Sequence, residues 1–224
     1  MILTGQEAFE VFKKEMLLSS TYAALSQGNV SNKCIPVVLD RDVLFERTPD
    51  VGEEIPNYKD SGAYLLRLPF PSSLSSETKG RYGKKILFPR GDLVIMRTRV
   101  FEQESLPRKE WITKEIPYAL LMSIYDLKGD LAETAVEDST VLYNGKKILA
   151  EETFYNRRTA IFRGHIHLKW DSHSQSIYEK FCSRYPSLYE KGSLLDDLDI
   201  PLETFLSVFS KNLAKLEEII SILH

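Results

Sequence analysis

The run from Val141 to Ile148 constrains the fold more than any other part of the sequence. It places the dipeptide Asn144-Gly145 between two short apolar segments. Asn-Gly is the strongest signal for a two-residue type I′ turn, because both turn positions need a positive φ that these residues adopt at low cost. The sequence therefore predicts an antiparallel β-hairpin here.

The register of this hairpin makes its two lysines notable. A two-residue turn sets Tyr143 opposite Lys146 and Leu142 opposite Lys147. Both faces are then largely apolar, so at least one lysine projects from a partly buried surface. That placement costs free energy unless the ammonium meets an anion or reaches water along its stem. A ligand carboxylate or phosphate and a sheet-edge lysine that reaches water both remain open. The alternation predicts that Lys147 shares a face with Leu142 and Leu149, and Lys146 with Val141, Tyr143 and Ile148.

Hydrophobic periodicity and turn signals predict the other elements. We expect helices at 6–26, 117–128 and 174–181 and from 201 onward, and strands at 34–39, 43–46, 63–68, 92–101 and 159–170. Pro117 is expected in the first turn of its helix and Gly129 just past its end. The segments 47–61 and 72–85 are expected to be loops, and the acids at 196–199 a polar turn before the last helix.

These elements indicate one α+β domain. Most strand connections look short, which favours a mixed, largely antiparallel sheet packed with helices over a doubly wound parallel sheet. We expect a single domain over residues 1–224, with a core to about residue 185 and a helical C-terminal ending over about 186–224. A chain of 224 residues with 43% hydrophobic residues can bury a core of this size.

Composition excludes several functional classes. The net charge of 29 − 32 = −3 argues against a surface that coats nucleic acid. No run approaches the ~20 apolar residues of a membrane span, and residues 1–14 lack the apolar stretch of a signal peptide. We expect a soluble, cytoplasmic protein with no nucleic-acid and no membrane partner. No GxSxG, Walker A, GxGxxG or HExxH motif is present.

A basic segment runs from Lys79 to Arg99 and carries a charge of 7 − 1 = +6. It could bind nucleotide phosphates or a carboxylate, or it could be a solvated face. The charged residues are Lys79, Arg81, Lys84, Lys85, Arg90, Arg97 and Arg99, against the single acid Asp92.

The strand expected at 159–170 alternates apolar and polar side chains. His165 and His167 fall on one face, followed by Asp171 and His173 in an HxH…DxH arrangement that could bind a divalent transition metal. Arg163 and Lys169 on that face would repel a cation. We therefore expect no metal, and a polar strand that faces a ligand or solvent.

Four stretches together resemble the lipoate–protein ligase, octanoyltransferase and biotin–protein ligase superfamily, closest to the lipoate–protein ligase A type. They are Phe88–Val94 with its Arg-Gly-Asp turn, Glu137-Asp138 at the family's Asn-Asp position, Asn144–Ile148 at the family's glycine-basic-lysine-isoleucine signature, and Arg163–Leu168 at its His-Gly-Thr strand. The segment from Gly192 to Phe209 is similar to the family's accessory helical ending.

The resemblance implies a biotin/lipoate-ligase-like fold and a ligase activity. Such an enzyme uses ATP with Mg²⁺ to activate lipoate or a related small-molecule acid as acyl-AMP, then transfers the acyl group to a lysine of a lipoyl-type acceptor domain. Lys147 would be the catalytic residue, contacting the acyl-adenylate and the acyl carbonyl. The implied substrate- and nucleotide-binding residues are Lys84, Lys85, Arg90, Gly91, Asp92, Asp138, Lys146, Arg163, Gly164 and His165.

The sequence also departs from the family pattern. It lacks the glycine triplet before the core strand, has Pro89 in place of a histidine, and has Leu149-Ala150 where the family has Ser-Gly. Neither Cys34 nor Cys182 stands where the octanoyltransferases carry their nucleophile. Longer side chains would narrow the acyl tunnel or the adenylate pocket, so either the substrate differs or catalysis is lost. The resemblance favours an enzyme, and a catalytically silent protein that binds a partner or a small acid on the same scaffold is the alternative.

Overall fold

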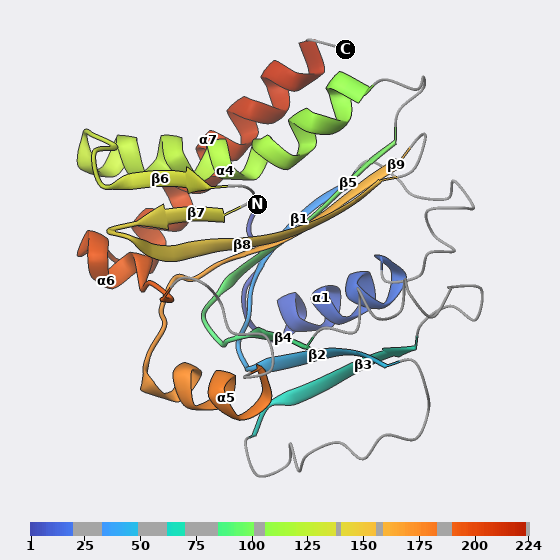
Figure 1. Ribbon diagram of the computed structural model, residues 1–224. Coiled ribbons are helices and arrows are strands. Elements are labelled where there is room, and N and C mark those ends of the chain that lie inside the picture. The colour runs from blue at the N-terminus through green and yellow to red at the C-terminus, as the bar shows by residue number, and fades with distance from the viewer. Residues whose placement is uncertain are drawn as a thin grey trace.

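A six-stranded antiparallel sheet forms the centre of the molecule (Figure 1). The computed structural model describes residues 1–19, 33–48, 62–69, 85–100, 106–137, 140–155, 159–182 and 190–222. Every pair of neighbouring strands in this sheet is antiparallel. The spatial order is β1 (Lys33–Val38), β5 (Leu93–Val100), β9 (Thr159–Ile166), β8 (Lys146–Tyr155), β7 (Thr140–Tyr143) and β6 (Thr134–Glu137).

A smaller, three-stranded sheet lies apart from the large one (Figure 1). Its order is β3 (Tyr64–Pro69), β2 (Val43–Thr48) and β4 (Lys85–Phe88). β2 pairs with β3 in parallel and with β4 in antiparallel. The predicted α+β class with a mixed, largely antiparallel sheet is confirmed. Lys85, expected on a loop, instead begins β4 opposite Glu46.

The helices divide between the two faces of the large sheet (Figure 1). α4 (Leu106–Lys128) and α7 (Leu202–Ile222) cover one face, while α1 (Gly5–Ser19) lies on the face toward the small sheet. α5 (Ser172–Cys182) lies beside β4, and α6 (Leu194–Leu198) precedes α7. No helix in the described ranges is long and apolar enough to cross a membrane.

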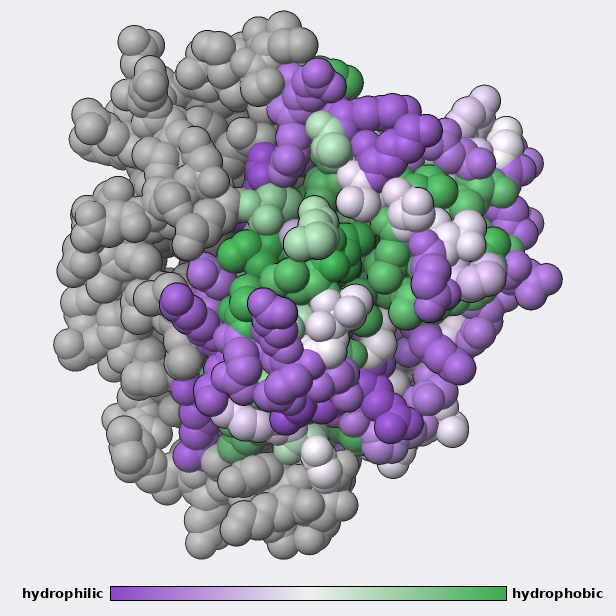
Figure 2. Space-filling view, turned by 180° about the vertical axis from the view of Figure 1, so that it is seen from behind, coloured by the Kyte–Doolittle hydropathy of each residue, from purple (hydrophilic) through white to green (hydrophobic). Residues whose placement is uncertain are grey.

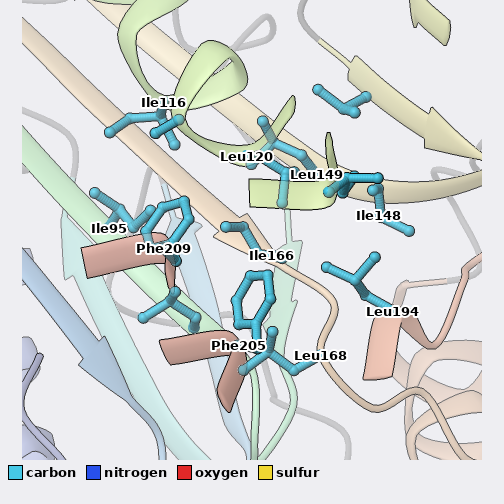
Figure 3. Close-up of a cluster of buried hydrophobic side chains, with 14 of the residues drawn as sticks. Ile95, Ile116, Leu120, Ile148, Leu149, Ile166, Leu168, Leu194, Phe205 and Phe209 are labelled. Atoms are coloured by element: carbon cyan, nitrogen blue, oxygen red, sulfur yellow. The ribbon is translucent and has the colours of Figure 1, made fainter. Parts of the chain in front are cut away.

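The main hydrophobic core fills the space between the large sheet and the helices α4 and α7 (Figure 3). Phe205 and Phe209 of α7 are fully buried there, and their rings stack with centroids 5.6 Å apart. The C-terminal helix therefore completes the core of the sheet, as its apolar stripe predicts. The other labelled members are Ile95, Ile116, Leu120, Ile148, Leu149, Ile166, Leu168 and Leu194.

A second core lies between the large sheet, α1 and the small sheet. Phe9, Phe12 and Met16 of α1 are buried in it, at the i, i+3, i+7 spacing that predicted this helix. Ala23 and the predicted end of the helix at residue 26 lie outside the described residues.

Seen from behind, hydrophobic residues also reach the surface in the middle of the molecule, where hydrophilic residues surround them (Figure 2).

The predicted hairpin is confirmed. Asn144 and Gly145 have φ values of 52° and 72°, and Leu142 and Tyr143 pair with Lys147 and Lys146 as expected. A register shift then pairs Val141 with Leu149. This bulge buries Leu149 in the same core as Val141, Tyr143 and Ile148, so the predicted grouping of Leu149 on a face with Lys147 is wrong, whereas the grouping of Ile148 with Lys146 holds.

Helix α4 begins eleven residues earlier than predicted, at Leu106. Pro117 therefore lies inside the helix, where it removes one backbone hydrogen bond, although proline favours the first turn. Burial of Ile116, Leu120 and Ile124 against the sheet offsets that loss. Gly129 follows the helix with a φ of 86°, as predicted.

Three other boundaries differ from the prediction. Strand β6 was not predicted, because no turn signal marks it in the sequence. It forms by pairing with β7. Strand β9 ends at Ile166, before His167. Asp196 and Asp197 lie in the short helix α6, and Asp199 ends it with a left-handed φ of 53°. Such short elements depend on tertiary pairing rather than on local sequence.

Arg97 of β5 neither lies on a solvated face nor is free to bind a ligand anion, the two interpretations given for the basic segment. It is buried and paired with glutamates. Its side chain is 8% exposed, lies 3.1 Å from Glu115 of α4, and lies 2.6 Å from Glu217 of α7. Glu115 is fully buried, whereas the Glu217 side chain is 40% exposed. The ion pair with Glu115 therefore ties β5 to the helical layer.

We expect Arg97→Met to lower the free energy of unfolding by about 3–5 kcal/mol, because it leaves Glu115 buried without its cation. Urea denaturation followed by circular dichroism measures the loss. The matched variant Glu217→Gln removes the exposed partner and should cost less than about 1 kcal/mol. A loss below about 1 kcal/mol for Arg97→Met would contradict the assigned role.

Candidate functional site

The candidate site lies on the face of the large sheet that points toward the small sheet. Register places His165 beside Val94 and Arg163 beside Met96, and both β5 residues belong to the second core. The ring of His165 lies 5.0 Å from that of Phe88 in β4. The predicted alternation of β9 is thus confirmed, with Phe162 on the opposite face in the main core.

Asp92, His165 and His167 form a buried group, which we call the Asp–His cluster. Asp92 Oδ2 lies 3.2 Å from His165 Nδ1 and 2.9 Å from His167 Nδ1. The three residues are 0%, 7% and 0% exposed, respectively. Asp92 and His165 are both predicted site residues, and the fold brings them into contact. Of the two alternatives predicted for this face, solvent is excluded, because both histidines are buried and His165 packs against Phe88 of the small sheet.

The turn before β5 positions Asp92. Gly91 has a φ of 85°, which glycine adopts without strain, and its amide donates to the Leu39 carbonyl at 2.8 Å. The amide of Arg90 donates to Asp42 Oδ1 at 3.0 Å. Asp42, which the sequence analysis did not single out, therefore anchors the predicted Arg-Gly-Asp turn from the neighbouring loop.

Burial dominates the electrostatics of the Asp–His cluster. It raises the pKa of Asp92 well above 3.8, because a carboxylate loses its hydration there. Burial likewise lowers the pKa of His165 and of His167 well below 6.5, and the charges of Lys191 and Lys147 add to this effect. Both histidines are therefore neutral near pH 7, with one ring nitrogen of each able to accept a proton or bind a metal.

Two lysines carry positive charge toward this cluster. Lys147 begins β8 opposite Leu142 and is half-buried, and its amide donates to the Glu190 carbonyl at 2.7 Å. The amide of Gly192 donates back to the Lys147 carbonyl at 2.9 Å, which sets Lys191 alongside Lys147. The Lys191 ammonium lies beside the Trp170 ring, whose centre is 5.1 Å from that of His167, so this pair of lysines lies on the His167 side of the cluster.

Lys191 is a residue that sequence reasoning missed. Its ammonium lies 6.0 Å from the Trp170 ring centre and 5.4 Å from that of Tyr178. Gly192 is the sequence feature that could have pointed to Lys191. A Cβ at this position would lie 2.9 Å from Ile148 Cγ2. Only glycine lets this segment approach β8 so closely without a shift.

The remaining predicted residues occupy different places. Lys84 and Asp138 lie outside the described residues, as does the side chain of Lys85. Arg163 is buried, with its guanidinium 5.8 Å from the Phe45 ring centre. Close packing explains the glycine at position 164, since a Cβ there would lie 2.7 Å from the Phe162 ring. Lys146 is half-buried on the hairpin next to Lys147.

A cleft of about 360 Å³ opens beside the Arg90-Gly91 turn. Arg90 and Lys169 supply cations to its lining, and Asp40 and Asp171 supply carboxylates. Gly91 precedes Asp92 in the chain, and Lys169 follows His167 by two residues. The cleft is thus built from the same two segments as the Asp–His cluster.

The HxH…DxH arrangement does not converge on one point. Asp171 Oδ1 accepts a hydrogen bond from the Ser174 amide at 2.9 Å, at the start of α5. His173 Nε2 lies 2.8 Å from Asp42 Oδ2. His165 and His167 therefore meet the Asp92 carboxylate from the turn before β5 instead of the acid and histidine that follow them in sequence.

Cys34 provides no nucleophile near the site. It lies in β1 opposite Arg97, and burial raises its pKa to about 12 although the Arg97 charge opposes the shift. A thiol with this pKa is almost fully protonated at neutral pH. Among the described residues, this environment argues against acyl-enzyme chemistry at Cys34.

We expect native Cys34 to react with iodoacetamide at pH 8 at least about 100-fold more slowly than in the unfolded chain, because its thiolate fraction is about one in 10⁴. Mass spectrometry of the Cys34 peptide measures the rate separately from Cys182. Equal rates in the native and unfolded chains would show that Cys34 is exposed and activated.

Comparisons with known proteins identify the fold. No protein-family model and no curated protein matches the sequence. Among solved structures, a lipoate–protein ligase A bound with ATP is similar with a TM-score of 0.60 and 14% identity, over 97% of this chain and 83% of that one. A putative lipoate protein ligase from T. acidophilum with bound lipoic acid gives a TM-score of 0.61 and 12% identity, over 97% and 85%.

A third similar structure comes from an archaeal lipoylation system of Thermoplasma acidophilum, described as a bipartite lipoate protein ligase and its E2 lipoyl domain. It gives a TM-score of 0.60 and 12% identity, over 97% of this chain and 82% of that one. With sequence identities this low, the structural similarity establishes the fold alone. The chain therefore has the fold of the lipoate–protein ligases, as the resemblance of its motifs predicts.

Proposed function

We propose that this protein is a lipoate–protein ligase-like enzyme that activates a carboxylic acid as acyl-AMP and transfers the acyl group to a lysine of a carrier protein. The observation that carries the proposal is the pairing of Lys147 with Lys191, whose ammonium lies beside the Trp170 ring that packs 5.1 Å from His167 of the Asp–His cluster. A ligase of this kind needs fixed cations where phosphate and carboxylate groups bind. The half-buried Lys147, at the hairpin position that the sequence singled out, supports this assignment.

The residues fit a nucleotide in two respects. The cleft of about 360 Å³ falls in the size range of small-molecule sites, and Arg90 and Lys169 line it. Apart from its two chain neighbours, no atom of the described residues lies within 4 Å of the position that a Cβ on Gly91 would occupy, which leaves room for a ligand beside this backbone. Mg²⁺ would accompany ATP, and Asp40 and Asp171 provide the oxygen ligands that it prefers.

The similar structures support the choice of substrates. One contains ATP, one contains lipoic acid, and one belongs to a lipoylation system with an E2 lipoyl domain. We therefore assign to this protein ATP, lipoate or a related acid, and a lipoyl-type acceptor domain, and we place the reaction in the cytoplasm.

The reaction has two balanced steps. A carboxylate oxygen of the acid attacks the α-phosphate of ATP, and pyrophosphate leaves. The neutral amine of the acceptor lysine then attacks the acyl carbonyl, AMP leaves, and the new amide nitrogen loses a proton. The ammonium of Lys147 stabilises negative charge on the phosphate and on the carbonyl oxygen. We assign contact with the ligand to Arg90, Gly91 and Lys146 together with Lys84, Lys85 and Asp138, and support of these contacts to Asp92, Arg163, Gly164 and His165.

We expect the purified protein to catalyse pyrophosphate exchange that depends on lipoic or octanoic acid, and to add that acyl group to an isolated lipoyl domain. Radiolabelled pyrophosphate measures the first step, and the mass of the lipoyl domain measures the second. ATP that raises the melting temperature without supporting either step would identify the silent binding protein instead. Neither binding nor turnover with any medium-chain acid would reject the proposed chemistry.

We expect Lys147→Ala to lower turnover by about 10²–10³-fold, because one preorganised charge is removed from the transition state. Unchanged far-ultraviolet circular dichroism and melting temperature would show that the fold is intact. The matched control is Lys211→Ala, which removes an exposed lysine from α7. Full activity of Lys147→Ala would remove Lys147 from the mechanism.

A further inference from the structure

The Asp–His cluster has the composition and spacing of a metal site. One ligand atom from each of Asp92, His165 and His167 lies within 4.8 Å of the other two. The two separations from Asp92 Oδ2 are 3.2 and 2.9 Å. Adjacent ligands of a tetrahedral ion with bonds of about 2.0–2.1 Å stand about 3.3 Å apart. Small side-chain adjustments would therefore suffice to coordinate an ion.

Burial makes the cluster costly when it holds no ion. Asp92 is completely buried, and its Oδ1 has no hydrogen-bond partner within the described ranges. A carboxylate in this environment needs a compensating positive charge. The charge of Lys191 favours the carboxylate form of Asp92, and a cation bound at the cluster would do so directly.

Arg163 and Lys169, which the sequence predicts to repel a cation, do so less strongly in the folded chain. Lys169 is exposed, because β9 ends at Ile166 and the chain turns away after the cluster. The guanidinium of Arg163 lies over the Phe45 ring. Lys147 and Lys191 still oppose a cation, and the carboxylate of Asp92 and nearby Asp42 favour it.

We propose that Asp92, His165 and His167 bind one divalent transition-metal ion, with zinc as the first candidate. Two imidazole nitrogens and one carboxylate oxygen suit zinc and its neighbours and do not suit Mg²⁺, which prefers oxygen ligands alone. This ion is therefore distinct from the magnesium that accompanies ATP. The site is independent of the proposed ligase activity, because none of its evidence concerns acyl transfer.

The ion would join two segments that lie 73 residues apart in sequence. One is the Arg-Gly-Asp turn before β5, and the other is the end of β9 beside Lys147 and Lys191. Coordination would hold the floor of the cleft against the central strands. Its role is thus structural, since the three ligand residues are buried and do not line the cleft beside the Arg90-Gly91 turn.

The test is elemental analysis of the full chain, purified without a histidine tag. We expect about one equivalent of zinc per chain in the wild type and less than about a tenth of an equivalent in Asp92→Asn and His167→Gln. The matched control His173→Gln removes a histidine that pairs with Asp42 outside the cluster, and it should keep its zinc.

A second measurement covers variants that fold poorly. Wild-type protein stripped with a chelator should melt several degrees higher after zinc is added, because an ion that binds only the folded chain stabilises it. Cobalt(II) should give the visible absorption of a tetrahedral site in the wild type and in His173→Gln. Wild-type protein without bound zinc, and without a zinc-dependent rise in melting temperature, would overturn the proposal and leave the cluster as a hydrogen-bonded triad.

Discussion

Strand β9 is buried on both of its faces, so the surrounding elements must provide apolar packing for one face and polar partners for the other. Phe162 and Ile166 point into the core under α4 and α7, while Arg163 and His165 point toward the small sheet. A strand in the middle of a sheet has no solvent edge, so its polar side chains must find partners inside the protein. Asp92, in the turn before β5, provides that partner for His165.

The two faces of the large sheet handle buried charge in different ways. On the helical face, Arg97 meets Glu115 and Glu217 directly, so opposite charges compensate each other. On the other face, the single carboxylate of Asp92 meets two neutral histidines, with Lys147 and Lys191 nearby. The first arrangement fastens the layers together. The second leaves a concentration of polar groups and positive charge at the end of the central strands, where a ligand or an ion gains most from it.

Local patterns predicted the elements that depend on few residues. The Asn144-Gly145 turn, the paired lysines and the amphipathic helix of Phe205 and Phe209 all follow from nearest-neighbour chemistry. Helix α4 was predicted too short because a proline in the interior of a helix is unfavourable in isolation, and packing on the sheet overrides that preference. Strand β6 escaped prediction because it exists only through its pairing with β7.

The sequence by itself determined the class of fold, the hairpin with its register, and the presence of Asp92, Lys147 and His165 as residues of interest. Only the tertiary structure decided which of them meet. It joined Asp92 to both histidines, brought Lys191 beside Lys147, and moved Asp171 and His173 away from the metal pattern. The physical reason is range: turns and helical stripes depend on residues a few positions apart, whereas the cluster joins residues 73 positions apart through strand pairing.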